Sequence, residues 1–112
     1  MTTYKTLNDI AQLDELDNQS RSRLQLIFKH STRCGVSSMA KRGLDMELRQ
    51  PDGTAFDIYY LDLIQYRAVS NHIATRYGIQ HESPQLLVIK DGRCIYHASH
   101  DDVSLHTALA AA

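Results

Sequence analysis

The residues best suited to chemistry are a cysteine and its neighbours, at the point where the sequence pattern changes from strand to helix. An apolar run, residues 24–28, is followed by the polar residues 29–33 and then by Cys34. After Cys34, apolar residues such as Val36 and Met39 recur at helical spacing. Cys34 should therefore lie in or just before the first turn of a helix. Unpaired backbone N–H groups and the helix dipole favour the nucleophilic thiolate there, which predicts a reactive thiol.

Basic residues beside this cysteine support the same chemistry. Lys29, His30 and Arg33 can add positive charge near Cys34. We single out His30 as a candidate catalytic residue, acting as a proton acceptor or as a cation, with His81 second. Structural hydrogen bonding is an equal alternative for both histidines. Arg33 is a candidate substrate-binding residue, because a guanidinium next to the nucleophile can bind the carboxylates of a small thiol.

Ser37 stands three residues after Cys34, where a dithiol oxidoreductase carries its second cysteine. A serine hydroxyl can hydrogen-bond a thiolate but cannot resolve a disulfide, so exchange at Cys34 is predicted to be monothiol, with Ser37 as a catalytic hydrogen-bond partner. Cys94 is the other internal candidate for resolution. Its place in an alternating strand favours core packing instead, and bridging would need Cα atoms within about 7 Å. None of the six histidines has structural-zinc spacing, so no metal site is expected.

Length and composition exclude several classes of protein. The 112 residues predict one domain, spanning 1–112, and 43% hydrophobic with 22% charged residues is ordinary for a globular protein. The formal charge of −1 gives no reason to expect nucleic acid or a membrane surface as a partner. Two cysteines are too few for a disulfide scaffold. With no apolar run of signal-peptide or membrane-spanning length, we expect a cytoplasmic protein of undetermined oligomeric state.

The same patterns predict the elements that position Cys34. Apolar and branched runs predict the four strands of a central sheet at residues 24–30, 56–63, 85–90 and 93–98. Residues 4–6 are a candidate for a short additional edge strand. Apolar residues at helical spacing predict helices from Asn8 or Asp9 through Leu16, from Cys34 to about Leu48, over 66–77, and from a cap at Ser99 or Asp101 to the C-terminus. Turns are expected at Pro51–Gly53, Gly78 and Asp91–Gly92.

The order of these elements predicts the fold. It is β-α-β followed by α-β-β-α, with an extra N-terminal helix. The right-handed crossover makes the first pair of strands parallel, and the Asp91–Gly92 hairpin adds an antiparallel pair. We therefore expect an α/β protein with the thioredoxin-like order, in which helices flank a central four-stranded mixed sheet.

In that fold a cis-proline opens the third strand and faces the nucleophilic cysteine. Pro84 stands at this position, immediately before the apolar strand 85–90. An ordinary strand-entry proline is an equal alternative. If the cis form is present, Ser83 and Pro84 are candidate substrate-binding residues, because the backbone of Ser83 can pair with an extended thiol substrate.

Specific motifs give the chain a resemblance to a known family. The segments are IFKHSTRC at 27–34, YYLDLIQYRAVSNHIA at 59–74 and HESPQLLVIKDG at 81–92, with Ser37 and the pair Ser99–His100. With them the chain resembles the monothiol bacilliredoxin-like, or YtxJ-like, proteins of the bacillithiol redox system. The resemblance covers about residues 24 to 101, and KHSTRC and HESPQ are its specific parts.

The resemblance implies a reaction. Cys34 would attack the mixed disulfide between bacillithiol and a protein cysteine, which frees the protein thiol and leaves bacillithiol on Cys34 until another thiol releases it. Bacillithiol is then a co-substrate, S-thiolated proteins are the partners, and no bound cofactor is expected. Family members usually carry proline directly after the cysteine, whereas this chain has Gly35. Glycine keeps an N–H available to the sulfur, which makes Gly35 a candidate substrate-binding residue.

Two other functions stay open at the level of sequence. The motif Cys34-Gly35-Val36-Ser37 is similar to the Cys-Gly-Phe-Ser motif of monothiol glutaredoxins, which carry an iron–sulfur cluster shared across a dimer. Val36 replaces the aromatic residue of that motif. Alternatively, the chain is a non-enzymatic redox sensor or binding domain, in which oxidation of Cys34 changes a contact with a partner.

Overall fold

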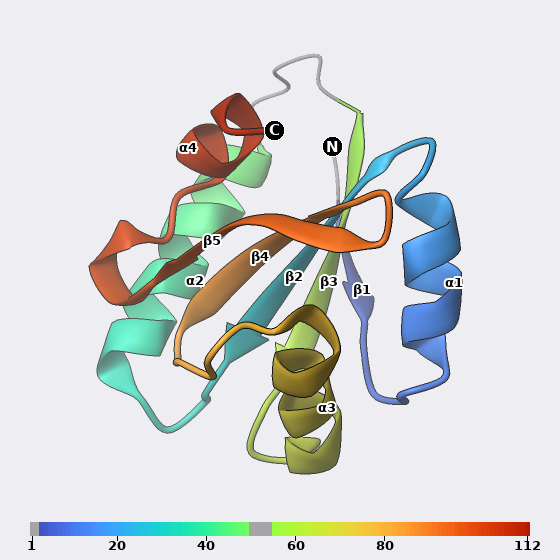
Figure 1. Cartoon of the computed structure of the whole chain (residues 1–112). Helices are drawn as coiled ribbons and strands as arrows, with labels where there is room; N and C mark the ends of the chain where they lie inside the picture. The colour runs from blue at the N-terminus through green and yellow to red at the C-terminus, as the bar shows by residue number, and fades with distance from the viewer. Residues whose placement is uncertain (1–2, 50–54) are drawn as a thin grey trace.

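The fold is a mixed five-stranded sheet with helices on both faces (Figure 1), as the computed structural model of the chain describes it for residues 3–49 and 55–112. The strands are β1 (Tyr4–Thr6), β2 (Leu24–His30), β3 (Phe56–Asp62), β4 (Gln85–Lys90) and β5 (Arg93–Ser99). The helices are α1 (Gln12–Gln19), α2 (Gly35–Leu48), α3 (Arg67–Tyr77), the 3₁₀ turn η1 (His100–Asp102) and α4 (Leu105–Ala110). The turn expected at Pro51–Gly53 lies outside the described residues.

Strand β2 occupies the centre of the sheet, whose order is β1-β3-β2-β4-β5. It pairs in parallel with β3, as the strand–helix–strand spacing predicted, and antiparallel with β4. The antiparallel pair predicted from the Asp91–Gly92 hairpin is β4 with β5. The sheet has five strands rather than the expected four, because Tyr4–Thr6 forms a parallel ladder with Ile58–Tyr60 of β3. The predicted thioredoxin-like order is confirmed with this addition.

Two apolar layers bury both faces of β2. Leu26 and Phe28 pack toward α2 and α4, in a cluster that includes Leu44 and Leu105. Ile27 packs on the opposite face, in a cluster with residues of α1 and α3. Because successive side chains of a strand point to opposite faces, every side chain near the end of β2 is forced into one layer or the other.

Local turn chemistry sets the element ends. Gly78 ends α3 in the left-handed conformation, with φ 68°, and Asp91 and Gly92 of the β4–β5 hairpin also have positive φ, 52° and 73°. The prediction for the last helix was wrong in its start. It begins at Leu105 with Ser104 as its N-cap, and Glu47 of α2 accepts hydrogen bonds from its first amides.

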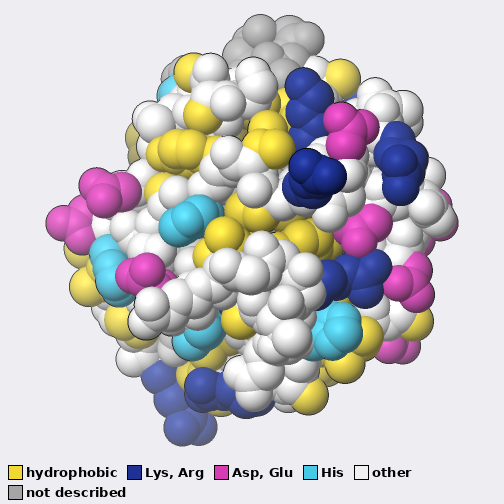
Figure 2. Space-filling model, in the orientation of Figure 1, with side chains coloured by type: hydrophobic (Ala, Val, Ile, Leu, Met, Phe, Trp, Pro, Cys, Tyr) yellow, Lys and Arg dark blue, Asp and Glu magenta, His cyan; other side chains and the backbone are white. Residues whose placement is uncertain are grey.

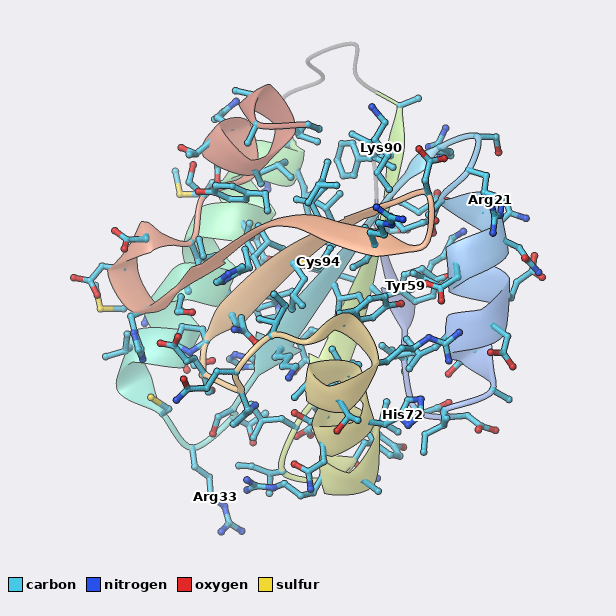
Figure 3. The ribbon with its side chains drawn as sticks, in the orientation of Figure 1. Arg21, Arg33, Tyr59, His72, Lys90 and Cys94 are labelled. Atoms are coloured by element: carbon cyan, nitrogen blue, oxygen red, sulfur yellow. The ribbon has the colours of Figure 1, made fainter. Side chains whose placement is uncertain are left out.

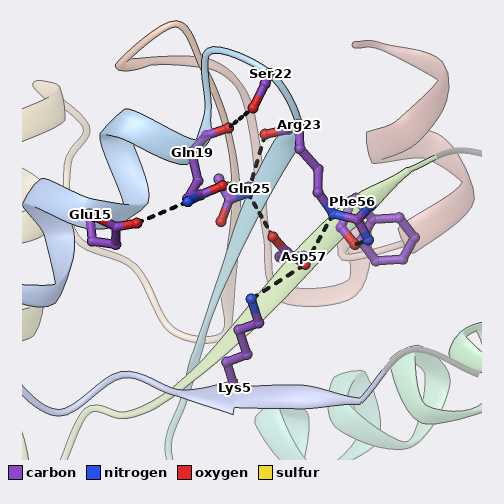
Figure 4. A network of polar contacts seen from close by, with 8 residues as sticks. All are labelled: Lys5, Glu15, Gln19, Ser22, Arg23, Gln25, Phe56 and Asp57. Atoms are coloured by element: carbon purple, nitrogen blue, oxygen red, sulfur yellow. Dashed lines mark hydrogen bonds and ion pairs between the residues drawn. The ribbon is translucent and has the colours of Figure 1, made fainter.

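A polar network holds the end of the sheet where β2 and β3 begin (Figure 4). Asp57 accepts hydrogen bonds from Arg23 at 3.1 Å and Gln25 at 2.9 Å, and lies 3.5 Å from the Lys5 ammonium. Burial alone would raise the pKa of Asp57, but the hydrogen bond from Gln25 and the charges of Lys5 and Arg23 lower it overall. This network lies at the end of the sheet opposite the cysteine described next.

Candidate thiol active site

Cys34 lies at the junction between β2 and α2. It is the N-cap of α2, with extended backbone angles of φ −109° and ψ 123° and no side-chain cap hydrogen bond. Its N–H donates to the carbonyl of Ser31 at 3.2 Å, and its own carbonyl accepts the first helical bond from Ser38 at 3.0 Å. The thiol is half-buried. The N-cap position puts this cysteine directly before the first turn of α2, whose amides have no partner within the helix.

Ser37 and His30 form a buried pair next to the cysteine. The Ser37 hydroxyl accepts the Ser31 N–H at 3.0 Å and lies 2.7 Å from Nδ1 of His30. Burial lowers the pKa of His30, and the charge of Lys41 adds to this effect, so the imidazole is neutral near pH 7. The ring stacks on Phe28, with centroids 5.7 Å apart. Within the described residues, the Ser37 hydroxyl makes no hydrogen bond to Cys34, and it instead ties the polar turn to the helix.

The segment before β4 lies at the same edge of the sheet as this junction. The peptide bond between Ser83 and Pro84 is cis, as the sequence position predicted. Lys29 of β2 pairs with Gln85 of β4, so the antiparallel register puts Pro84 beside His30, at the strand end that leads to Cys34. The Ser83 hydroxyl is buried without a hydrogen-bond partner among the described residues. The two segments expected to form the site therefore converge.

Arg33 and Gly35, the two remaining predicted residues, flank the cysteine at the surface. The Arg33 side chain points away from the body of the molecule (Figure 3) and is exposed. Gly35 is also exposed, and a Cβ built on it would meet no atom within 4 Å. Neither a close contact nor a positive φ requires glycine here. The structure thus leaves space for the proline that the resemblance led us to expect after the cysteine.

Lys29 is a member of this region whose burial the sequence reasoning missed. Its side chain is fully buried. The ammonium donates to the Ser70 carbonyl at 3.1 Å and lies 3.3 Å from Nδ1 of His81, and no carboxylate pairs with it in the part of the chain that the structure describes. Burial lowers the pKa of Lys29 to about 8. Lysine in the second-last position of a strand covered on both faces was the signal that could have revealed this.

His81 belongs to the same polar cluster, on the α3 face of the sheet. Its Nδ1 also lies 3.3 Å from the Ser70 hydroxyl. Burial lowers the pKa of His81, and the charges of Lys29 and Arg67 lower it further. Neutral His81 with Nδ1 as an acceptor fits both contacts. Through His81, these contacts attach the segment that leads to Pro84 to Lys29 of β2 and Ser70 of α3.

Cys94 lies far from Cys34. It pairs with Ile89 of β4, which in turn pairs with Gln25 of β2. Gln25 is five residues before His30, so about 16 Å of strand separates the row of Cys94 from the end that leads to Cys34. The Cys94 thiol donates to the Tyr96 carbonyl at 3.3 Å, and burial raises its pKa. This placement agrees with core packing and excludes a direct bridge to Cys34.

No group of three or more His, Cys, Asp and Glu side chains in residues 3–49 and 55–112 is arranged to hold a metal ion. No helix in those ranges has the length and hydropathy of a membrane span.

Solved structures share this architecture. A protein described as a candidate oxidoreductase with a thioredoxin fold is 27% identical, with a TM-score of 0.81 over 95% of this chain and 90% of that one. Thioredoxin from Malassezia sympodialis is 16% identical, with a TM-score of 0.77 over 97% of this chain and 89% of its own. Fasciola hepatica thioredoxin is 20% identical, with a TM-score of 0.67 over 86% of each chain. The two thioredoxins establish the fold.

The family is established by a model that covers nearly all of the sequence. The model described as monothiol bacilliredoxin BrxC matches residues 5–108. The match includes Cys34, Ser37 and the Ser83–Pro84 segment. Together with the fold, it makes this protein a thiol redox enzyme of the thioredoxin-like superfamily. By sequence and by architecture, the chain belongs to the monothiol bacilliredoxin family.

Proposed function

We propose that the protein reduces mixed disulfides between protein cysteines and bacillithiol, with Cys34 as the nucleophile. The observation that carries the proposal is a lone thiol at the N-terminus of α2. Serine occupies the position of a second thiol, and Cys94 lies at the other end of the sheet. Such a site can exchange disulfides but cannot resolve them internally. Family membership supports bacillithiol as the small thiol.

The reaction follows from the position of Cys34. The thiolate attacks the bacillithiol sulfur of the mixed disulfide, the sulfur–sulfur bond breaks, and the electron pair leaves on the protein sulfur, which takes up a proton. Cys34 then carries bacillithiol through a disulfide. A second small thiolate attacks the bacillithiol sulfur, releases a small-molecule disulfide and restores the Cys34 thiolate.

The neighbouring residues have distinct roles in this proposal. The amides of the first turn of α2, including that of Gly35, stabilise the thiolate. The backbone beside Pro84 aligns the substrate in extended form, and Arg33 contacts carboxylates of the small thiol. Ser37 and His30 act as positioning residues, because their mutual hydrogen bond holds the turn that presents Cys34. Two cysteines are too few for a disulfide scaffold, which fits the reducing cytoplasm as the place of action.

A thiol-release assay tests the proposal. A protein with one cysteine modified by bacillithiol is incubated with wild type, Cys34→Ala or Cys94→Ser, and the intact masses are recorded. We expect wild type and Cys94→Ser to free the substrate thiol and to gain one bacillithiol adduct, which added bacillithiol removes. Cys34→Ala should do neither. Release by Cys34→Ala at the wild-type rate would overturn the assignment.

The identity of the small thiol needs a second arm. The same substrate protein is modified with glutathione and assayed alongside the bacillithiol form. Faster release of bacillithiol supports the family inference. Equal or faster release of glutathione leaves Cys34 as the nucleophile and removes bacillithiol as the preferred thiol.

A further inference from the structure

An open groove with a volume of about 400 Å³ lies between α2 and η1. These two elements lie side by side in the fold (Figure 1). The α2 wall follows directly from the cysteine and consists of Val36, Met39, Ala40 and Gly43. The opposite wall is formed by His100 and Asp101, next to Val103. The groove thus begins two residues after the proposed nucleophile.

The α2 wall exposes large apolar side chains. Val36 is 47% exposed and Met39 is 69% exposed. Burial of such side chains by a partner is favourable in proportion to the apolar area removed from water. Met46, also on α2, is 66% exposed but does not line the groove. The helix therefore provides both a test position and a matched control.

The η1 wall is acidic and is fixed to the cis-proline segment. The His100 N–H donates to the Pro84 carbonyl at 2.9 Å, and its ring lies 3.6 Å from the Glu82 carboxylate. Asp101 and Asp102 are exposed and form no ion pair with any described residue. Figure 2 shows acidic side chains at the left margin of the molecule, where Figure 1 draws the turn after β5. One wall is therefore apolar, and the other carries the carboxylate of Asp101, with Asp102 next to it in the sequence.

We propose that this groove binds the target-protein leg of the mixed disulfide, as an extended segment with an apolar and a basic residue on one side of its cysteine. The inference deepens the exchange reaction proposed above and rests on Cys34 as its nucleophile. Along α2, Gly43 lies about 13 Å beyond Cys34, which an extended chain spans with about four residues. The apolar residue packs on Met39, and the basic residue faces Asp101.

The charge of the η1 wall indicates which part of the mixed disulfide, the target protein or the small thiol, occupies the groove. A small thiol that carries carboxylates would meet Asp101, and Glu82 lies close by, which disfavours its binding there. The Arg33 side of Cys34 has the charge that suits those carboxylates. The groove therefore selects among target proteins and leaves the small thiol to the other side of the cysteine.

Methionine methyl resonances test the groove without depending on turnover. The chain has three methionines, Met1, Met39 and Met46. A peptide activated as a mixed disulfide with thionitrobenzoate, with leucine and lysine within three residues of its cysteine, is loaded onto Cys34 of the methyl-labelled Cys94→Ser protein. We expect the Met39 methyl signal to shift and the Met46 signal to stay. Loading bacillithiol alone should shift neither.

Kinetics provide the second measurement. Peptides thiolated by bacillithiol carry either leucine and lysine or serine and glutamate beside the cysteine. Wild type should prefer the first by about three- to tenfold in kcat/KM. Met39→Glu should lose the preference, Met46→Glu should keep it, and Asp101→Lys should favour the acidic peptide. Bacillithiol disulfide should form the Cys34 adduct, with release of one bacillithiol, at the same rate in wild type and Met46→Glu, because the small thiol is held on the other side of the cysteine.

The outcomes separate the two proposals. The groove assignment is overturned if the Met39 signal does not move when the peptide is loaded. It is also overturned if Met39→Glu slows the reaction with bacillithiol disulfide as much as the reaction with the peptides, because the small thiol would then occupy the groove. A Met39 shift that appears only at high protein concentration, without peptide, indicates a second copy of the chain and also overturns it. Failure of the thiol-release assay with a retained peptide-dependent shift removes only the exchange reaction.

Discussion

At the scale of single residues, the Ser37 hydroxyl connects the polar turn before Cys34 to the first turn of α2. It is fully buried and satisfies both the Ser31 amide and the His30 ring. Loss of a buried hydrogen-bonding group leaves its partners unsatisfied, which costs about 1–3 kcal/mol. The hydroxyl therefore contributes to the shape of the site through the turn that carries the thiol.

Ser37→Ala is expected to lower the free energy of unfolding by about 1–2 kcal/mol, because the Ser31 amide and His30 lose their partner. Urea denaturation measures the change. Ser38→Ala is the matched control on the same helix, since its hydroxyl makes no hydrogen bond within the described residues. An unchanged stability of Ser37→Ala, together with a large fall in the alkylation rate of Cys34, would instead favour a direct bond between the hydroxyl and the thiolate.

Lys29 presents a different residue-scale problem, a buried cation without a carboxylate. Its pKa is about 8 in the folded protein, lowered by burial, and near 10.4 in an unfolded chain. Below pH 8 both states are protonated, and the buried charge opposes folding. Between about pH 8 and 10.4 the unfolded state binds more protons, so stability from this residue rises with pH.

Lys29→Met should remove that rise. We expect the stability of wild type relative to Lys29→Met to increase by about 1–2 kcal/mol between pH 7.5 and 9.5. Urea unfolding at the two pH values measures this difference. Lys90→Met, which changes an exposed lysine at the end of β4, is the control and should track wild type. A difference that does not change with pH would mean that Lys29 keeps its proton in the fold.

At the scale of elements, the N-terminus of α2 is built to accept a more rigid residue than it has. Cys34 has the extended backbone that a residue before proline requires. Gly35 occupies the first helical position, where proline is favoured, and the space for a side chain is open. Compared with proline, glycine gives the unfolded chain more conformational freedom and retains one more N–H donor near the sulfur.

Gly35→Pro is expected to raise the free energy of unfolding by about 0.4–1 kcal/mol, because the unfolded chain loses conformational freedom. The same substitution removes the Gly35 N–H, so the alkylation of Cys34 below neutral pH should slow. Gly35→Ala keeps the N–H and separates the two effects. Equal alkylation rates in the proline and alanine variants would show that this amide does not stabilise the thiolate.

At the scale of the whole molecule, strand register keeps the two thiols apart. β5 runs antiparallel to β4. Cys94 pairs with Ile89 of β4, which pairs with Gln25 near the start of β2. Cys34 follows the opposite end of that strand. The two positions are separated by about 16 Å along the strand, whereas the Cα atoms of a disulfide lie within about 7 Å of each other.

Mild oxidation of the folded protein should therefore give dimers or small-thiol adducts through Cys34 and no internal disulfide. Non-reducing electrophoresis and intact mass, with Cys94→Ser and Cys34→Ser side by side, measure the products. Cys94→Ser should behave as wild type, and Cys34→Ser should remain monomeric. A wild-type product two mass units lighter, absent in both variants, would contradict the register argument.

Much of the molecule follows from its sequence because the deciding interactions are local. The Asp91–Gly92 turn, the end of α3 at Gly78 and the strand-to-helix junction at Cys34 are set by backbone preferences and apolar spacing over a few residues. Those preferences operate in any context, so the order of the strands and main helices was predicted correctly, although the last helix begins later than expected and the turn η1 was not predicted. The cis bond at Pro84 came from its position in that order, since the sequence alone left both isomers open.

What only the tertiary structure decided concerns side chains that serve several segments at once. The sequence determined that Cys34 begins a helix and that Ser37 cannot resolve a disulfide. Three features depend on which layers cover β2 and on the register of β4 and β5. They are the burial of Lys29, the hydrogen bond between Ser37 and His30, and the groove between η1 and α2. These arrangements join residues far apart in the sequence, such as Lys29 and His81, which are 52 positions apart. No local preference encodes them, because they form only when both apolar faces of the sheet are buried.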